Sequence, residues 1–249
     1  MGGSCSREWA PPHQLVAARE GPKAVLPPVA IVWACALSVD EYVAAGKAVA
    51  VPRPDCPECS TAMAFWSGYE RSVRHDGPAL RVWVRRARCR PCRVSHALVP
   101  SFCLLGRLDA VEVIGAVLAA VFVDGRGVRA PAAEADVPHT TARDWVRRFR
   151  RRAEVLAAGF AAVVVELSGQ APSLHSVATA AGRAMAAMRA AFAVALARAG
   201  PALRSLWRFV AAVTGGRLLG TNTNPLSIVL GRRRLIAPVP DDDRNGATT

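Results

Sequence analysis

Apolar side chains alternate with polar ones along two stretches in the first half of the chain, and a period of two predicts β-strands. In residues 79–89 the apolar positions are Leu80, Val82 and Val84, and the opposite face carries Arg81, Trp83 and Arg85. Residues 63–73 have a similar content of aromatic and β-branched residues. Because Asp76-Gly77 between the two stretches is a hairpin signal, we expect a β-hairpin with one packed face and one basic, aromatic face.

The period changes to that of an α-helix after residue 108. Apolar residues then recur at helical spacing up to Gly125, at Val113, Val117, Ala120 and Val121. Further helices are expected over residues 128–136, 140–167, 173–199 and 201–213. Before the hairpin, residues 29–51 predict a short strand followed by a helix that Ser38 and Glu41 cap and Gly46 ends.

Charge indicates a partner for this helical protein. The chain has 32 Lys and Arg against 19 Asp and Glu, a net charge of +13, and every basic residue except Lys23 and Lys47 is arginine. An excess of this size favours a polyanion such as nucleic acid. The N-terminal residues lack the pattern of a secretory signal, and arginines interrupt the Ala-rich stretch over residues 177–199. We therefore expect a cytoplasmic protein that does not enter a membrane.

Two CxxC pairs flank the predicted hairpin, and they consist of Cys56, Cys59, Cys89 and Cys92. Zn²⁺ binds four thiolates in a tetrahedron, and a hairpin can bring two CxxC turns together. We expect a structural Zn²⁺ that supplies folding free energy to a unit too small for a core of its own. His75 and His96 are nearby, but four thiolates already complete the coordination shell.

Two other interpretations of the cysteines are less favoured. A reducing cytosol argues against a disulfide framework. A thioredoxin-like redox centre requires one CxxC pair in a βαβ context, which two pairs joined by a hairpin do not provide.

Residues 128–152 have the side chains of a helix-turn-helix. Ala132 is small where two helices would cross, Asp136 replaces the usual turn glycine, and Val137, Ala142 and Trp145 are expected to face the core. We expect His139 or Thr140 to cap the second helix. Its outward residues, predicted to contact bases and phosphates, are Thr140, Thr141, Arg143, Arg147 and Arg148, with Asp144 among them.

Five arginines between residues 147 and 152 strengthen this interpretation. They are expected to form a helix end at which the guanidinium groups repel one another unless a polyanion neutralises their charge. The alternative is an ordinary amphipathic helix with a solvated arginine face.

The segments "CPEC", "RRARCRPCRVSHALVPSF" and "GVRAPAAEADVPHTTARDWVRRF" together resemble the N-terminal DNA-binding half of bacterial insertion-sequence transposases. They resemble more closely an uncharacterised family of bacterial zinc-ribbon and helix-turn-helix proteins, a domain of unknown function, with a similarity that covers most of the chain. The resemblance implies sequence-directed DNA binding. It does not imply an activity.

Catalysis is not expected. An RNase H-like transposase needs three carboxylates around two metal ions. After Arg152 the chain offers only Glu154, Glu166 and the terminal aspartates 241–243, in an Ala-rich helical context.

We therefore expect a mostly α protein with a small β zinc ribbon, in which a helix-turn-helix domain and C-terminal helices follow the ribbon. The expected divisions are a flexible arm (1–28), a strand-helix lead-in (29–51), a zinc ribbon (52–102), a helix-turn-helix DNA-binding domain (108–156), an Ala-rich helical region (157–215) and a loose C-terminal tail (216–249).

The expected function is sequence-directed binding of double-stranded DNA, in a transposon-associated or regulatory role. The phosphates would be held by the hairpin arginines Arg81, Arg85, Arg86 and Arg88. An inactive transposase remnant or accessory subunit that acts through protein contacts is the alternative. In that alternative the ribbon would bind a transposase protein instead of DNA. A homodimer would use the apolar stripe formed by Phe192, Leu196, Leu203, Trp207 and Val210, which can otherwise be part of the core.

Overall fold

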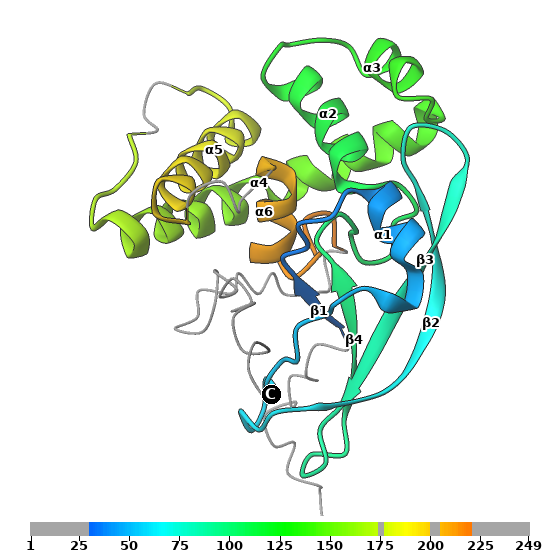
Figure 1. Ribbon diagram of the computed structural model, residues 1–249. Helices are drawn as coiled ribbons and strands as arrows, with labels where there is room; N and C mark the ends of the chain where they lie inside the picture. Colours follow the sequence, from blue (N-terminus) through cyan, green and yellow to red (C-terminus); the bar gives the residue numbers. More distant parts are fainter. Residues whose placement is uncertain (1–29, 174–176, 200–204, 221–249) are drawn as a thin grey trace, which may run out of the picture.

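The computed structural model describes residues 30–173, 177–199 and 205–220 (Figure 1). The expected arm over residues 1–28 lies outside the described residues, as do Leu203 and the part of the expected tail after residue 220. Helices predominate and accompany a four-stranded mixed sheet, so the expectation of a mainly helical protein with a smaller β part is confirmed.

The sheet contains β1 (Ala30–Trp33), β2 (Ala64–Arg74), β3 (Ala79–Arg88) and β4 (Ser95–Pro100) in the order β1-β4-β3-β2. Strands β2 and β3 form the predicted antiparallel hairpin. Its turn has positive φ at Asp76 (+47°) and Gly77 (+133°), which matches the hairpin signal. Val82 and Val84 are fully buried, so the predicted packed face is confirmed.

The sheet is larger than the predicted hairpin because β4 joins it. The sequence pattern predicts no strand over residues 95–100, yet β4 pairs antiparallel with β3 and parallel with β1, where Ile31 lies opposite Leu98. The parallel pairing joins segments more than sixty residues apart, so no local pattern signals it. Strand β1 therefore belongs to the same sheet as the hairpin.

Helix α1 (Val39–Ala45) forms as predicted. Ser38 accepts a hydrogen bond from the Glu41 amide, the Glu41 side chain accepts one from the Ser38 amide, and Gly46 ends the helix at φ +51°. The short 3₁₀ helix η1 (Gly46–Ala48) follows. Tyr42 is fully buried and its hydroxyl donates to the Trp83 carbonyl at 2.8 Å, which fixes α1 against β3.

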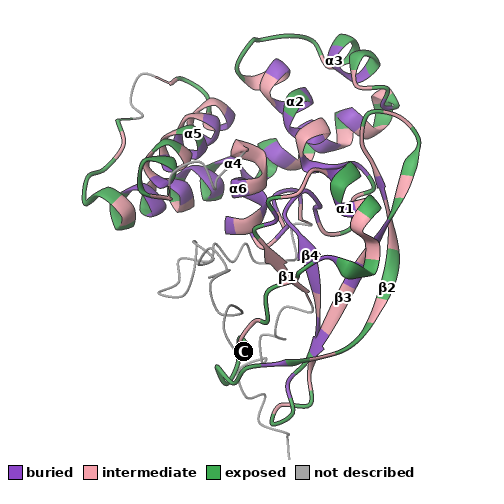
Figure 2. Cartoon of the chain, viewed as in Figure 1, coloured by how far each residue is buried: buried purple, intermediate pink, exposed green. Residues whose placement is uncertain are grey.

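The remaining helices are α2 (Val111–Phe122), α3 (Arg129–Glu134), α4 (His139–Ser168), α5 (Ala180–Ala199) and α6 (Leu206–Val213). Helix α4 crosses the whole helical part, and α5 packs along its C-terminal half (Figure 1). In Figure 2 these helices carry many residues coloured as buried. Trp145, Phe149 and Phe160 of α4 contribute the largest of them.

Among the described helices, α5 has the length and apolar composition of a membrane span, with a hydropathy of 1.3. Core helices of soluble proteins pass the same test. Met185 and Met188 of α5 are buried in the helical core, and 39% of the apolar window of this helix is buried.

Arginines connect the helical part with the sheet. Arg208 of α6 forms an ion pair with Glu112 of α2 and donates to the Cys35 carbonyl at 3.2 Å. Arg71 of β2 donates to the carbonyls of Leu104 and Arg107 in the segment before α2. Hydrogen bonds thus run from α6 to the segment between β1 and α1, and from β2 of the hairpin to the segment before α2.

Candidate metal centre and basic surfaces

The four cysteines of the CxxC pairs lie together at the open end of the hairpin. Their Sγ atoms are all within 4.8 Å of one another, with 3.4 Å between Cys59 and Cys89 and 3.9 Å between Cys56 and Cys92. A tetrahedral ion with metal–sulfur bonds of about 2.3 Å would place sulfurs about 3.8 Å apart. A disulfide would require about 2.05 Å. The cluster therefore has the dimensions of a metal site, and the four cysteines are free thiols.

The two CxxC turns have the same backbone geometry. The Cys56 amide donates to the Thr61 carbonyl and the Cys89 amide donates to the Val94 carbonyl, both at 2.9 Å and both five residues apart. Ser60 and Arg93, each directly after the second cysteine of its pair, have left-handed φ values of +57° and +59°. Such φ values are uncommon for residues other than glycine. The repeated conformation presents two sulfurs from each turn in an equivalent way.

Electrostatics within the cluster favour a bound cation. Hydrogen bonding with Thr61 lowers the pKa of Cys59 to about 6. The adjacent Cys59 raises the pKa of Cys92 to about 12. One sulfur ionises readily and its neighbour then resists ionisation, because adjacent negative charges repel. A divalent cation at the centre would remove this conflict and allow all four to bind as thiolates.

Two other thiols are structural. Cys35 and Cys103 are buried, and burial raises their pKa values to about 11 and about 12. They remain protonated and pack in the core of the sheet. Cys5 lies outside the described residues. In the described part of the chain, the candidate ligand cluster contains cysteines alone and neither His75 nor His96.

At the other end of the hairpin, α3 and α4 meet at the predicted turn. Asp136 has φ +48°, the left-handed conformation expected for this position. The predicted core residues Ala132, Val137, Ala142 and Trp145 are all buried. The predicted cap is wrong, because Pro138 is the N-cap of α4 and no side chain caps it. Proline still suits a helix start, since it fixes φ and lacks a donor that would need a partner.

The outward face of α4 is basic at its N-terminal half. Thr140, Arg143 and Arg147 are exposed on successive turns, and Thr141 and Arg148 beside them are partly exposed. Asp144 forms ion pairs with Arg147 and Arg148, so it neutralises part of this charge. Arg151 is also exposed and continues the stripe one turn beyond Arg147. Helical spacing from Arg147 would have identified it.

The arginine run does not end a helix, because α4 continues for sixteen residues beyond Arg152 to Ser168. Arg152 itself is only 7% exposed and faces the core. The run therefore spans two faces of one long helix. Arg150 lies against the Phe122 ring, with 5.4 Å between its Cζ and the ring centroid.

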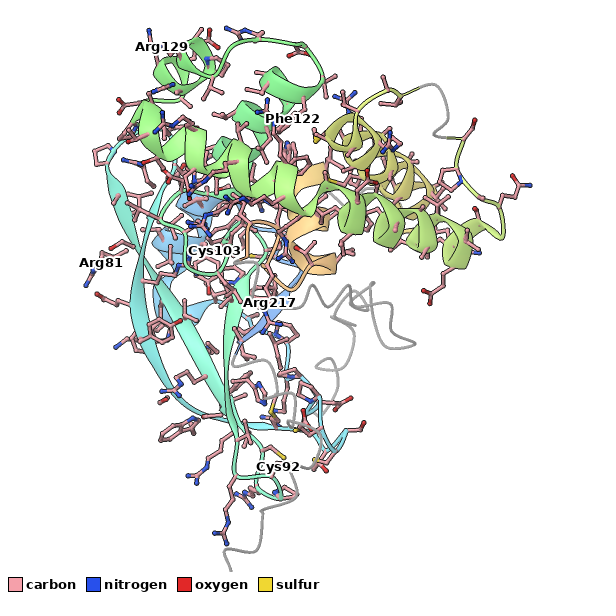
Figure 3. The ribbon with its side chains drawn as sticks, turned by 180° about the vertical axis from the view of Figure 1, so that it is seen from behind. Arg81, Cys92, Cys103, Phe122, Arg129 and Arg217 are labelled. Atoms are coloured by element: carbon pink, nitrogen blue, oxygen red, sulfur yellow. The ribbon has the colours of Figure 1, made fainter. Side chains whose placement is uncertain are left out.

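The four predicted phosphate contacts on β3 do not share one face. Strand alternation separates Arg81 and Arg85 from Arg86 and Arg88. Arg81 contacts Glu70 and Ser72 of β2 and projects outward beside the hairpin (Figure 3).

The other three arginines of β3 lie nearer the cysteine cluster. Arg85 donates to the Lys47 carbonyl and lies over Phe65, whereas Arg86 and Arg88 lie beside the Trp66 ring. These aromatic partners were missed because a bulge in β2 disturbs the alternation there.

The cysteine cluster and the turn between α3 and α4 lie at opposite ends of the hairpin. In Figure 3, Cys92 is at the bottom of the molecule and Arg129 of α3 is at the top. Arg74, the last residue of β2, lines a shallow surface depression together with Asp136, Val137 and Pro138 of the helix turn. The ten residues of β3 span roughly 33 Å, so the cysteine cluster lies far from the exposed face of α4.

Comparison with protein families shows one similarity. Residues 56–145 match the model of a domain of unknown function, DUF6431. This segment begins at the first metal-cluster cysteine and ends in the first two turns of α4. It thus includes all four cysteines, the hairpin and the turn between α3 and α4. No curated protein and no solved structure matches the chain.

Proposed function

We propose that this protein binds double-stranded DNA in a sequence-directed way, with α3 and α4 as a helix-turn-helix and α4 in the major groove. One observation carries the proposal: a short helix, a left-handed turn at Asp136 and a second helix present Thr140, Arg143 and Arg147 to solvent on successive turns. These side chains can donate to base edges and phosphates. The buried Val137, Ala142 and Trp145 fix the orientation of that face.

In this proposal the four cysteines hold a structural Zn²⁺ and form a zinc ribbon with β2, β3 and β4. Among the described residues, the core at the cluster has five buried members, of which Cys56 and Cys89 are cluster cysteines and the others are Met63, Ala87 and Leu98. So small a core contributes little folding free energy, and a metal would supply the remainder. The arginines of β3 would contact phosphates.

The proposal assigns no catalytic activity. Glu154 and Glu166 are both on α4 and twelve residues apart, which separates them by about 18 Å along the helix axis. Two-metal nucleases require their metal ions about 4 Å apart. The aspartates 241–243 lie outside the described residues. A cytoplasmic role in transposition or regulation fits this description.

The alternative, an accessory subunit that acts through protein contacts, has one supporting observation. Val155 and Val165 on the C-terminal half of α4 are 57% and 45% exposed, and Leu196 of α5 is 37% exposed. Exposed apolar residues of this size are typical of protein interfaces when they form a patch. Association through them would be insensitive to salt, whereas DNA binding weakens steeply as salt rises.

Selection of bound sequences from random duplex DNA, followed by affinity measurements, tests the proposal. We expect Arg143→Ala to weaken binding of the selected duplex by about tenfold and to relax sequence preference. Arg147→Ala should weaken binding of all duplexes alike and reduce the slope of log affinity against log salt concentration by about 1. Arg189→Ala is the matched control, since it removes an exposed arginine from α5. Equal effects of all three substitutions would contradict the assignment of α4 to the groove.

A further inference from the structure

A bulge near the metal end of β2 presents one tryptophan to solvent. Phe65 pairs with Ala87 and Ser67 pairs with Arg86, so Trp66 between them has no partner on β3. Bulges redirect side chains. Trp66 is the most exposed aromatic residue in the described part of the chain, at 53%.

The exposed ring is nevertheless held in place. The Trp66 Nε1 donates to Ser95 Oγ at 2.6 Å, and the Cζ atoms of Arg86 and Arg88 lie 5.6 and 5.7 Å from the ring centroid. An indole fixed on a strand and flanked by guanidinium groups is a preorganised surface for stacking, because little side-chain entropy remains to be lost on binding.

A shallow hollow next to Trp66 adds further rings. Its lining residues are Lys47, Phe65, Trp66, Ser67, Gly68, Trp83 and Arg85. Gly68 is essential to its shape, since a Cβ atom there would lie 2.5 Å from the Trp83 ring. The Trp83 indole can therefore lie flat against the backbone of β2. Lys47 Nζ is 4.6 Å above this ring.

The cations of this region are not used in ion pairs. Within the described residues, no ion pair involves Lys47, Arg53, Arg85, Arg86 or Arg88. The nearest acid on the hairpin, Glu70, is paired with Arg81. Five cations around three aromatic rings, without a carboxylate partner, are complementary to a polyanion that also offers flat apolar faces.

We propose that an aromatic-basic patch, which continues around the edge strand β2 from the face of Arg86 and Arg88 to the face of Arg85, binds unpaired nucleotides of single-stranded nucleic acid. The patch is formed by Lys47, Arg53, Phe65, Trp66, Trp83, Arg85, Arg86 and Arg88. A base stacks on the Trp66 indole and the arginines bind the adjacent phosphates. The bases of a duplex are not free to stack on these rings, because they already stack on one another. The patch is a second site, remote from α4, and it refines the phosphate role proposed above for three of the hairpin arginines.

The test measures binding of the full-length protein to labelled oligothymidine and oligouridine of about 15 nucleotides, the upper range of such sites, and to a duplex. We expect Trp66→Ala to weaken single-strand binding by about tenfold or more and to leave duplex binding within about twofold. Trp66→Phe should retain most single-strand affinity but show weaker quenching of tryptophan fluorescence by the oligonucleotide, because Trp83 then remains as the only tryptophan of the patch. The two oligonucleotides distinguish DNA from RNA as the ligand.

Controls separate this proposal from the role of α4. Arg143→Ala should weaken duplex binding alone, and Arg189→Ala should alter neither. Retained zinc content and circular dichroism would show that the Trp66 variants fold. Two results would overturn the proposal: the unaltered protein does not bind single strands, or Trp66→Ala loses affinity for the single strand and for the duplex equally. The first result would assign the patch to a protein partner instead.

Discussion

Three residues other than glycine hold left-handed backbone conformations in the CxxC turns and in the turn before α4. Ser60 and Arg93 do so in the CxxC turns, and Asp136 does so between α3 and α4. Only the third could be expected from the sequence, because the helix-turn-helix pattern places a glycine-like residue there. The other two follow from the geometry that closes each turn around a pair of sulfurs. Local residue preference would have assigned neither.

Substitution of Asp136 tests how far the turn depends on this conformation. We expect Asp136→Val to lower the free energy of unfolding by about 1–2 kcal/mol, because a β-branched side chain clashes in the left-handed region. Urea denaturation followed by circular dichroism measures the change. Asp136→Asn is the matched control and should be within about 0.5 kcal/mol of the unaltered protein, since Asn tolerates this conformation. A neutral Asp136→Val would show that the turn differs from the one described.

At the scale of elements, the sequence predicted those that local patterns determine. The hairpin of β2 and β3, helix α1 with its capping box and the long helix α4 all follow from periodicity and turn residues. Strand β4 was missed because it obtains its partners from β3 and from the distant β1. The division of the β3 arginines between two faces was available from strand alternation, but the bulge at Trp66 was not.

The metal end of the hairpin should depend on Zn²⁺ while the helical part does not. We expect one zinc ion per chain, lost in Cys89→Ser and on strong chelation. Chelation should then increase hydrogen exchange and proteolysis near residues 55–62 and 89–95, because the core there is small. Helices α2 to α6 share a separate core and should stay protected.

Cys35→Ala is the matched control for this experiment, since it removes a buried thiol outside the cluster and should leave zinc content unchanged. Full protection of the metal end after chelation would contradict a structural metal. Loss of all helices at once would show instead that the two cores unfold as one unit.

At the scale of the whole molecule, the hairpin separates two surfaces that are proposed to bind different forms of nucleic acid. Its upper end lies beside the turn before α4, and its lower end carries Trp66 and the cysteine cluster. From Arg74 to Trp66 the strand spans roughly 26 Å. The anchoring of the hairpin by Arg71, and of Arg74 to Asp109 at 2.6 Å, makes this separation a fixed property of the fold.

A DNA molecule with a duplex and a single-stranded overhang should therefore bind more tightly than either part alone. Once α4 has bound the duplex, the overhang is held near the aromatic-basic patch at high effective concentration. We therefore expect the affinity for the whole DNA molecule to exceed that for the blunt duplex by about tenfold or more. Because the gap is roughly 26 Å, an overhang of about ten nucleotides should give this gain and one of about two should not. Competition gel shifts measure both. Trp66→Ala should abolish the gain without altering binding of the blunt duplex, whereas an equal gain for both overhangs would mean that the two surfaces do not bind one molecule.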